Sequence, residues 1–104
     1  MRLRRDPFRD VIARQLDLFV ADEAELLEDC RDRFRAYEGA AREEAEEAYG
    51  QFVDAVESAT EALADMRDRF GRTLGEDAAE VYEDAFNRAV RKRWPELGLE
   101  IENR

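Results

Sequence analysis

Between residues 41 and 70, apolar and small residues recur in an almost unbroken alternation of four- and three-residue steps. They are Ala41, Ala45, Ala48, Phe52, Val56, Ala59, Leu63, Met66 and Phe70. Residues three and four positions apart share one face of an α-helix, whereas a half-buried strand needs apolar residues at every second position. The spacing therefore predicts a long helix whose single apolar stripe must be buried against other helices. Gly50 does not shift the phase of the stripe, so we interpret it as a glycine inside the helix, costing about 1 kcal/mol relative to alanine.

Two further stripes with helical spacing flank this one. The first comprises Val11, Ile12, Leu16, Phe19, Leu26, Leu27, Cys30, Phe34 and Tyr37, and the last comprises Ala78, Val81, Tyr82, Ala85, Phe86, Ala89 and Val90. We predict helices over residues 7–37, 41–74 and 76–93. Asp6 and Pro7 suit the N-cap and first position of the first helix, and Pro95 ends the last one by restricting Trp94.

The first predicted helix has an alternative description. Asp22 and Glu25 have the spacing of a capping box, which favours a break or kink near Asp22. A chain that breaks there and folds back would bury the residues of the first stripe without a partner.

Gly39 separates the first stripe from the second, and we predict that the chain reverses there through a left-handed C-cap. Replacement of Gly39 by alanine would then destabilise the protein, because alanine resists that conformation. The alternative is one continuous helix across Gly39, supported by a possible pair between Glu38 and Arg42. We expect residues 95–104 to form an extended tail, in which Leu97, Leu99 and Ile101 alternate with Gly98 and acidic residues and dock on the helices.

These elements predict an all-α fold. We expect a long antiparallel helical hairpin with a shorter third helix on its open end, completing a helical bundle by dimerisation. The predicted organisation is a basic N-terminal arm at residues 1–6, a single helical domain at residues 7–94 and a C-terminal tail at residues 95–104.

The charge balance narrows the classes of function. The chain of 104 residues carries 27 acidic and 17 basic side chains, for a net charge of −10. This charge opposes binding to the phosphates of nucleic acids. No apolar run is long enough for a membrane span, and the start MRLRRDPFRD has no apolar region after its basic residues, so we expect no membrane association, no signal peptide and a cytoplasmic location.

The residue types also narrow the chemistry. The chain has no histidine, which removes histidine-based nucleophile activation and the Glu-x-x-His ligands of di-iron bundles. The carboxylate pairs Glu43 with Glu47 and Glu57 with Glu61 stand one turn apart, but they lie toward water rather than on the apolar stripe. Cys30 lies on the first stripe and is interpreted as a small core residue. We expect no catalytic residue, no cofactor and no metal, and a carboxylate-metal site or small enzyme is the less favoured alternative.

The unequal helix lengths point to an interaction surface. Helices over residues 7–37 and 41–74 would be about 45 to 50 Å long, whereas residues 76–93 would span only about 27 Å. The half of the hairpin near Gly39 is therefore left uncovered, and a monomer rarely exposes so large an apolar patch. The expected interface residues are Leu26, Leu27, Cys30, Phe34, Tyr37, Ala45, Ala48, Tyr49 and Phe52. We predict a non-catalytic interaction or assembly module that forms a homodimer, or binds another helical protein, through this hairpin tip.

Charge is distributed unevenly along the chain. Residues 43–65 contain eight acidic residues and no basic one, while residues 2–9 and 88–93 are rich in arginine. This segregation favours an acidic partner at the ends, or a head-to-tail alignment of molecules.

The stretch Tyr37-Glu38-Gly39, between two long predicted helices in a chain of this length, resembles the bend of the WXG100 secreted proteins. In that family a Trp-x-Gly motif joins the two helices of a hairpin. Here tyrosine replaces the tryptophan, and the family's Tyr-x-x-x-Asp/Glu motif is broken because Phe86 follows Tyr82 by four residues. The resemblance implies an alternative function, a helical hairpin effector exported by a dedicated secretion system.

Overall fold

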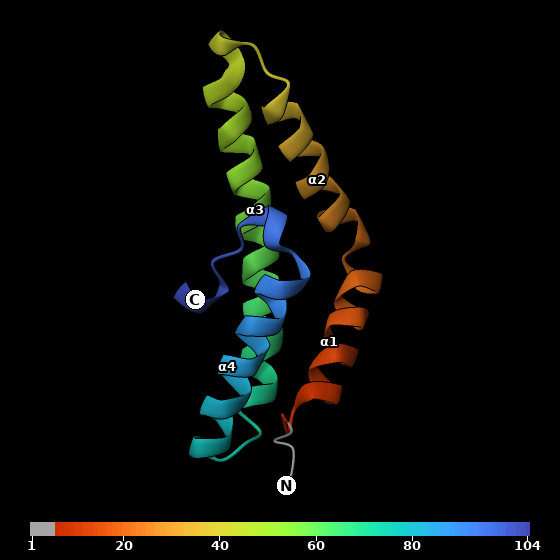
Figure 1. The fold of residues 1–104 in the computed structure, drawn as a ribbon, viewed down its shortest axis with the longest axis vertical. Coiled ribbons are helices and arrows are strands. Elements are labelled where there is room, and N and C mark those ends of the chain that lie inside the picture. The colour runs from red at the N-terminus through yellow and green to blue at the C-terminus, as the bar shows by residue number, and fades with distance from the viewer. Residues whose placement is uncertain (1–5) are drawn as a thin grey trace, which may run out of the picture.

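The computed structural model describes residues 6–104, and it is all-α as predicted (Figure 1). The elements are α1 (Arg9–Asp22), α2 (Ala24–Glu38), α3 (Arg42–Gly71), α4 (Glu76–Arg93) and two short 3₁₀ helices, η1 (Pro95–Leu97) and η2 (Ile101–Asn103). No strand occurs among these residues. Of the predicted basic arm at residues 1–6, only Asp6 belongs to the described part of the chain.

The long first helix is interrupted at Glu23, so the prediction of one helix over residues 7–37 is wrong and the predicted alternative of a break near Asp22 is correct. Glu23 leaves helical geometry, with φ −116° and ψ 35°, and no side chain caps α2. The Glu23 N–H still donates to the Phe19 carbonyl oxygen at 2.8 Å. The chain therefore bends without folding back, and α1 continues down the molecule beside α4 (Figure 1). The bend brings the Phe19 ring 5.9 Å from that of Trp94.

The predictions of Asp6 as N-cap and Pro7 as first helical residue are wrong, because α1 begins at Arg9 with Phe8 as its N-cap, and Asp6 contributes to the preceding turn instead. Its carboxylate accepts a hydrogen bond from the Phe8 N–H at 3.0 Å, and its carbonyl oxygen accepts one from the Arg9 N–H at 3.2 Å. Asp6 therefore caps the turn from which α1 continues.

The chain reverses around Gly39, so that α2 and α3 run side by side in opposite directions (Figure 1). The predicted left-handed conformation is wrong, because Gly39 has φ −94° and ψ 2°. The turn is made instead by a tightened end of α2, where the Ala40 N–H donates to the Tyr37 carbonyl oxygen at 3.2 Å, and by Ala41 in an extended conformation. Any residue can adopt these angles, so glycine is not required at this turn.

α3 buries two faces rather than one. The second buried face comprises Thr60, Ala64, Arg67 and Gly71, again at steps of four, three and four, and it was missed in the sequence. It lies against α4 and the tail: the Arg67 guanidinium bonds to the side chain of Asn87, and a Cβ at Gly71 would stand 3.6 Å from Glu83. α3 ends at Gly71, three residues before the predicted end.

α4 begins and ends at the predicted residues, and Tyr82, Ala85, Phe86 and Val90 are buried. Two residues assigned to its buried face, Ala78 and Val81, are exposed, because the last helix meets α1 and α3 along a narrower stripe than predicted.

The C-terminal tail docks on the helices, as predicted. Leu97, Leu99 and Ile101 are all buried in the same core as the helices. The tail is not extended, however. Gly98, in the left-handed region at φ 62°, connects two turns of 3₁₀ helix and redirects the chain between them.

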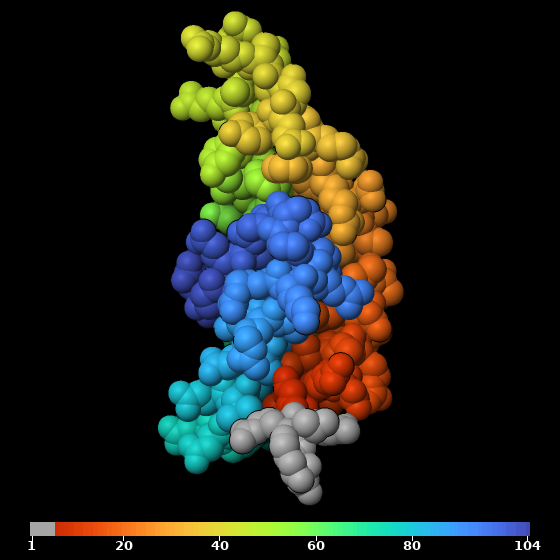
Figure 2. Space-filling model, viewed as in Figure 1, coloured from red at the N-terminus to blue at the C-terminus, as the bar shows by residue number. Residues whose placement is uncertain are grey.

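The molecule is elongated, with extents of 56 × 31 × 24 Å and a radius of gyration of 16.0 Å, against about 13 Å expected for a compact domain of this size. The elongation has one cause. α1, α4 and the tail cover the carboxyl-terminal half of α3 and the tail extends toward Phe52, whereas among the described residues only α2 accompanies the first turns of α3, which project beyond the tail (Figure 2).

Candidate interaction surface

The projecting part of α2 and α3, residues 34–52, is called the tip. Two aromatic pairs join its helices: Phe34 with Phe52, with ring centroids 5.3 Å apart, and Tyr37 with Tyr49, at 5.2 Å. With no third helix over them, these rings remain accessible. Tyr49 is 51% exposed and Tyr37 is 36% exposed, while Phe34 and Phe52 are half-buried. The tip therefore presents aromatic surface that residues 6–104 leave uncovered.

The nine residues expected at the interface divide into three groups. Leu27 and Cys30 are fully buried among the chain's own helices, and a partner does not reach them in this structure. Leu26 is half-buried and packs on the core next to them. The remaining six lie on the tip: Phe34, Tyr37, Ala45, Ala48, Tyr49 and Phe52. Leu27 and Cys30 therefore do not belong to the exposed surface, which corrects the expectation from the sequence: both side chains are buried in the chain's own core.

Cys30 behaves as the core residue predicted from its position. Burial raises the pKa of its thiol, and the neighbouring Asp29 carboxylate raises it further. A raised pKa leaves little of the reactive thiolate at neutral pH.

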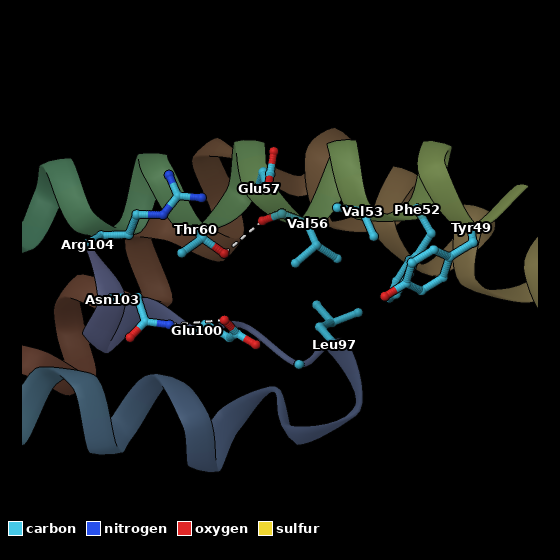
Figure 3. Close-up of a pocket in the computed structure, with 11 residues that line it drawn as sticks. Tyr49, Phe52, Val53, Val56, Glu57, Thr60, Leu97, Glu100, Asn103 and Arg104 are labelled. Atoms are coloured by element: carbon cyan, nitrogen blue, oxygen red, sulfur yellow. Dashed lines mark hydrogen bonds between the residues drawn. The ribbon is translucent and has the colours of Figure 1, made fainter. Parts of the chain in front are cut away.

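A groove of about 440 Å³ begins at the tip and runs between α3 and the tail (Figure 3). Its lining comprises Tyr49, Phe52, Val53, Val56, Glu57, Thr60, Leu97, Gly98, Glu100, Asn103 and Arg104. The figure shows Leu97 reaching from the tail toward Val56, with Tyr49 and Phe52 at one end. The Thr60 hydroxyl donates to the Val56 carbonyl oxygen at 2.8 Å, which satisfies the polar group beside this apolar strip.

This groove was not predicted from the sequence, because one of its walls is the docked tail and the tail's position on the helices was unknown. The one signal in the sequence was the alternation of Leu97, Leu99 and Ile101, which predicts that the tail docks but not which helix it packs against. An apolar strip edged by Glu57, Glu100 and Arg104 suits the apolar face of a helix or an extended segment.

Arg67 holds the tail wall of the groove in place. Its side chain is almost completely buried, and its guanidinium donates to the carbonyl oxygens of Ile101 at 3.1 Å and Arg104 at 2.8 Å. Further bonds to Asn87 and Asp68 satisfy the rest of the group. A buried guanidinium needs such partners, since desolvation without them is costly. Arg67 therefore ties α3, α4 and the tail together.

The tip is acidic as well as aromatic. Glu43, Glu44, Glu46 and Glu47 are exposed on the first turns of α3. The carboxylate pairs considered in the sequence, Glu43 with Glu47 and Glu57 with Glu61, both face solvent. Within residues 6–104, no three acidic or cysteine side chains lie close enough together to hold a metal ion.

None of the helices in residues 6–104 combines the length and the apolar character needed to cross a membrane. Comparisons of the chain with protein-family models, curated proteins and solved structures found no match.

Proposed function

We propose that this protein is a non-catalytic interaction module whose binding surface is the tip. Its partner is a helical protein or a second copy of the chain, and its place of action is the cytoplasm. The observation that carries the proposal is the exposure of Tyr37 and Tyr49 beside a groove of mixed apolar and polar lining, at the end of the molecule where only α2 and α3 pack among residues 6–104.

The chemistry of the tip supports this role. Tyrosine is enriched at the centres of protein interfaces, because it combines a large apolar ring with a polar end and loses little conformational entropy. The small residues Ala45, Ala48 and Gly50 lie on the same part of α3, and a Cβ placed at Gly50 meets no atom within 4 Å. A partner helix can therefore approach closely, and a pair of helices laid on the tip would complete a four-helix arrangement.

The proposal is tested with Tyr49→Asp against a matched control, Leu18→Asp. Leu18 is 58% exposed on α1, away from the tip, so both changes place a carboxylate where an exposed apolar side chain stood. Because neither side chain is in the core, circular dichroism and the melting temperature should change little in either variant.

Sedimentation and light scattering then measure association of the wild type with itself or with a helical partner. Tyr49→Asp should weaken it by at least about 30-fold, the effect of losing an interface residue worth about 2 kcal/mol, and Leu18→Asp should leave it unchanged. Equal association by wild type and Tyr49→Asp would remove the tip as the binding surface.

A further inference from the structure

A second hollow, of about 300 Å³, lies between α1 and α4 and plays no part in the surface described so far. We call it the trough, and it is lined by Asp6, Arg9, Ile12, Ala13, Leu16, Ala85, Ala89, Lys92 and Arg93. Its floor is apolar, because Ile12 and Leu16 come from α1 and Ala85 and Ala89 from α4. The alanines are too small to fill the space between the two helices, which leaves an apolar depression on the surface.

The rim of the trough is basic. Three of its lining residues carry a positive charge, namely Arg9, Lys92 and Arg93, and one carries a negative charge, Asp6. Arg93 is engaged within the chain, with its guanidinium 3.0 Å from the Asp17 carboxylate and 5.5 Å from the centre of the Trp94 ring.

The other two cations are available to a ligand. Arg9 and Lys92 are exposed and form no ion pair within residues 6–104. An adjacent hollow shares Lys92 and adds Arg88 and Arg91. In a chain with a net charge of −10, this concentration of cations around an apolar floor selects an anionic ligand with an apolar part.

The tip has the complementary chemistry. It presents two exposed tyrosine rings, and the glutamates of the first turns of α3 are exposed on the same end of the molecule. The tip lies at one end of the long axis, and α1 and α4 occupy the other half (Figure 1), so rigid helices keep a molecule's tip away from its own trough.

We propose that the tip of one copy docks in the trough of another. A tyrosine of the tip covers the apolar floor, and Glu43 and Glu47 face Arg9 and Lys92. The inference rests on the proposed function, since it takes the tip as the binding surface and names a second copy as its partner.

Charge favours this arrangement over pairing of two tips. Two tips side by side would bring the glutamates of both copies together, whereas a tip in a trough joins opposite charges. The contact uses different surfaces on the two copies, so repetition produces a ring or a linear chain of molecules.

The test uses two variants of the full chain, each with one surface removed. The trough variant, Arg9→Glu with Lys92→Glu, keeps its tip; the tip variant, Tyr37→Asp with Tyr49→Asp, keeps its trough. All four positions are exposed, so both variants should retain the wild-type circular dichroism spectrum. Sedimentation at about 100 µM covers association in the micromolar range.

The wild type should form species larger than a dimer at low salt, and raising the salt to about 0.5 M should weaken them by about tenfold or more, because exposed charges are screened. Each variant alone should be a monomer. Their equimolar mixture should give a one-to-one dimer and nothing larger, since only one intact tip and one intact trough remain per pair. A chain with Arg9→Glu, Lys92→Glu, Glu43→Lys and Glu47→Lys should associate again, because both charges are reversed together.

Two results would overturn the inference. Dimerisation of the trough variant alone would show pairing of tips and would leave the proposed function intact. A monomeric wild type whose tip binds a different helical protein would likewise leave only the tip as a binding surface.

Discussion

Two tyrosines in similar aromatic pairs have opposite exposures, and the comparison separates the two halves of the molecule. Tyr82 lies 4.8 Å from the ring of Phe70, and Tyr49 lies 5.2 Å from that of Tyr37. Tyr82 is fully buried, and its hydroxyl donates to the Gln15 side chain at 2.8 Å, whereas Tyr49 is 51% exposed. The distance between paired rings is thus similar in both halves. The ring is buried only where a third helix packs against the pair, as it does at Tyr82.

The difference shows what a third helix contributes. Around Tyr82, α1, α3 and α4 meet, and aromatic residues stabilise the fold. At the tip only α2 and α3 pack together among the described residues, so aromatic residues with the same helical spacing stay accessible to water, and this is the surface that we propose for binding. The following predictions test how far this contrast holds.

The largest expected effect on stability comes from removing one aromatic ring in each half of the molecule. Phe86→Ala removes a fully buried ring and should lower the free energy of unfolding by about 3 to 5 kcal/mol. Phe34→Ala removes a half-buried ring and should cost only about 1 to 2 kcal/mol, because the transfer free energy follows the area buried. Urea denaturation followed by circular dichroism measures both losses. Equal losses would mean that the tip is covered in solution.

The buried tyrosine should make stability depend on alkaline pH. Burial raises the pKa of Tyr82 from 10.0 to about 12. Between these values the unfolded chain releases the proton and the folded chain keeps it, so the stabilisation is present below pH 10 and declines up to about pH 12, by at most roughly 2 to 3 kcal/mol. Denaturation curves at pH 9 and pH 11.5 should show the decline in the wild type but a smaller one in Tyr82→Phe. Identical slopes in the two proteins would contradict this assignment.

The packing of the C-terminal tail on the helices should depend on the buried guanidinium of Arg67. Arg67→Met removes the donors to the carbonyl oxygens of Ile101 and Arg104 and should cost about 2 kcal/mol, because the buried oxygen of Ile101 loses its partner. Arg33→Met is the matched control near the tip, where the guanidinium bonds to Asp29 and Gln51 at the surface, and it should cost less than about 0.5 kcal/mol. Hydrogen exchange of residues 97–103 should accelerate only in Arg67→Met. Unchanged exchange there would show that the apolar residues hold the tail alone.

The smallest effects are expected at two glycines. Gly98→Ala places a side chain in the left-handed region and should cost about 1 to 2 kcal/mol. Gly39→Ala should be neutral, or stabilising by up to about 1 kcal/mol, because φ is −94° and the new Cβ would stand in ordinary contact, 3.6 Å from the Arg35 oxygen. This reverses the expectation from the sequence. Thermal melts of the two variants test this prediction. A lower melting temperature for Gly39→Ala would support the left-handed turn predicted from the sequence.

The sequence alone determined the elements that depend on local chemistry. Helical spacing located α4 at its observed residues and α3 to within three residues at its end. Trp94 before Pro95 stopped α4, and the apolar alternation in residues 97–101 predicted a docked tail. The acidic composition of the tip was also evident, because charges on exposed helical faces can be read without knowing their neighbours.

Only the tertiary structure decided which faces meet. Phe19, near the end of α1, packs against Trp94 from far along the chain, and Leu27 and Cys30 are core residues rather than interface residues. The second buried face of α3, with Arg67 bonded to the tail, requires partners more than 30 residues away in the chain. The groove and the trough exist only between elements distant in sequence. Periodicity specifies which side of a helix is apolar, but the burial of a given side chain is determined by the neighbouring element that packs against it.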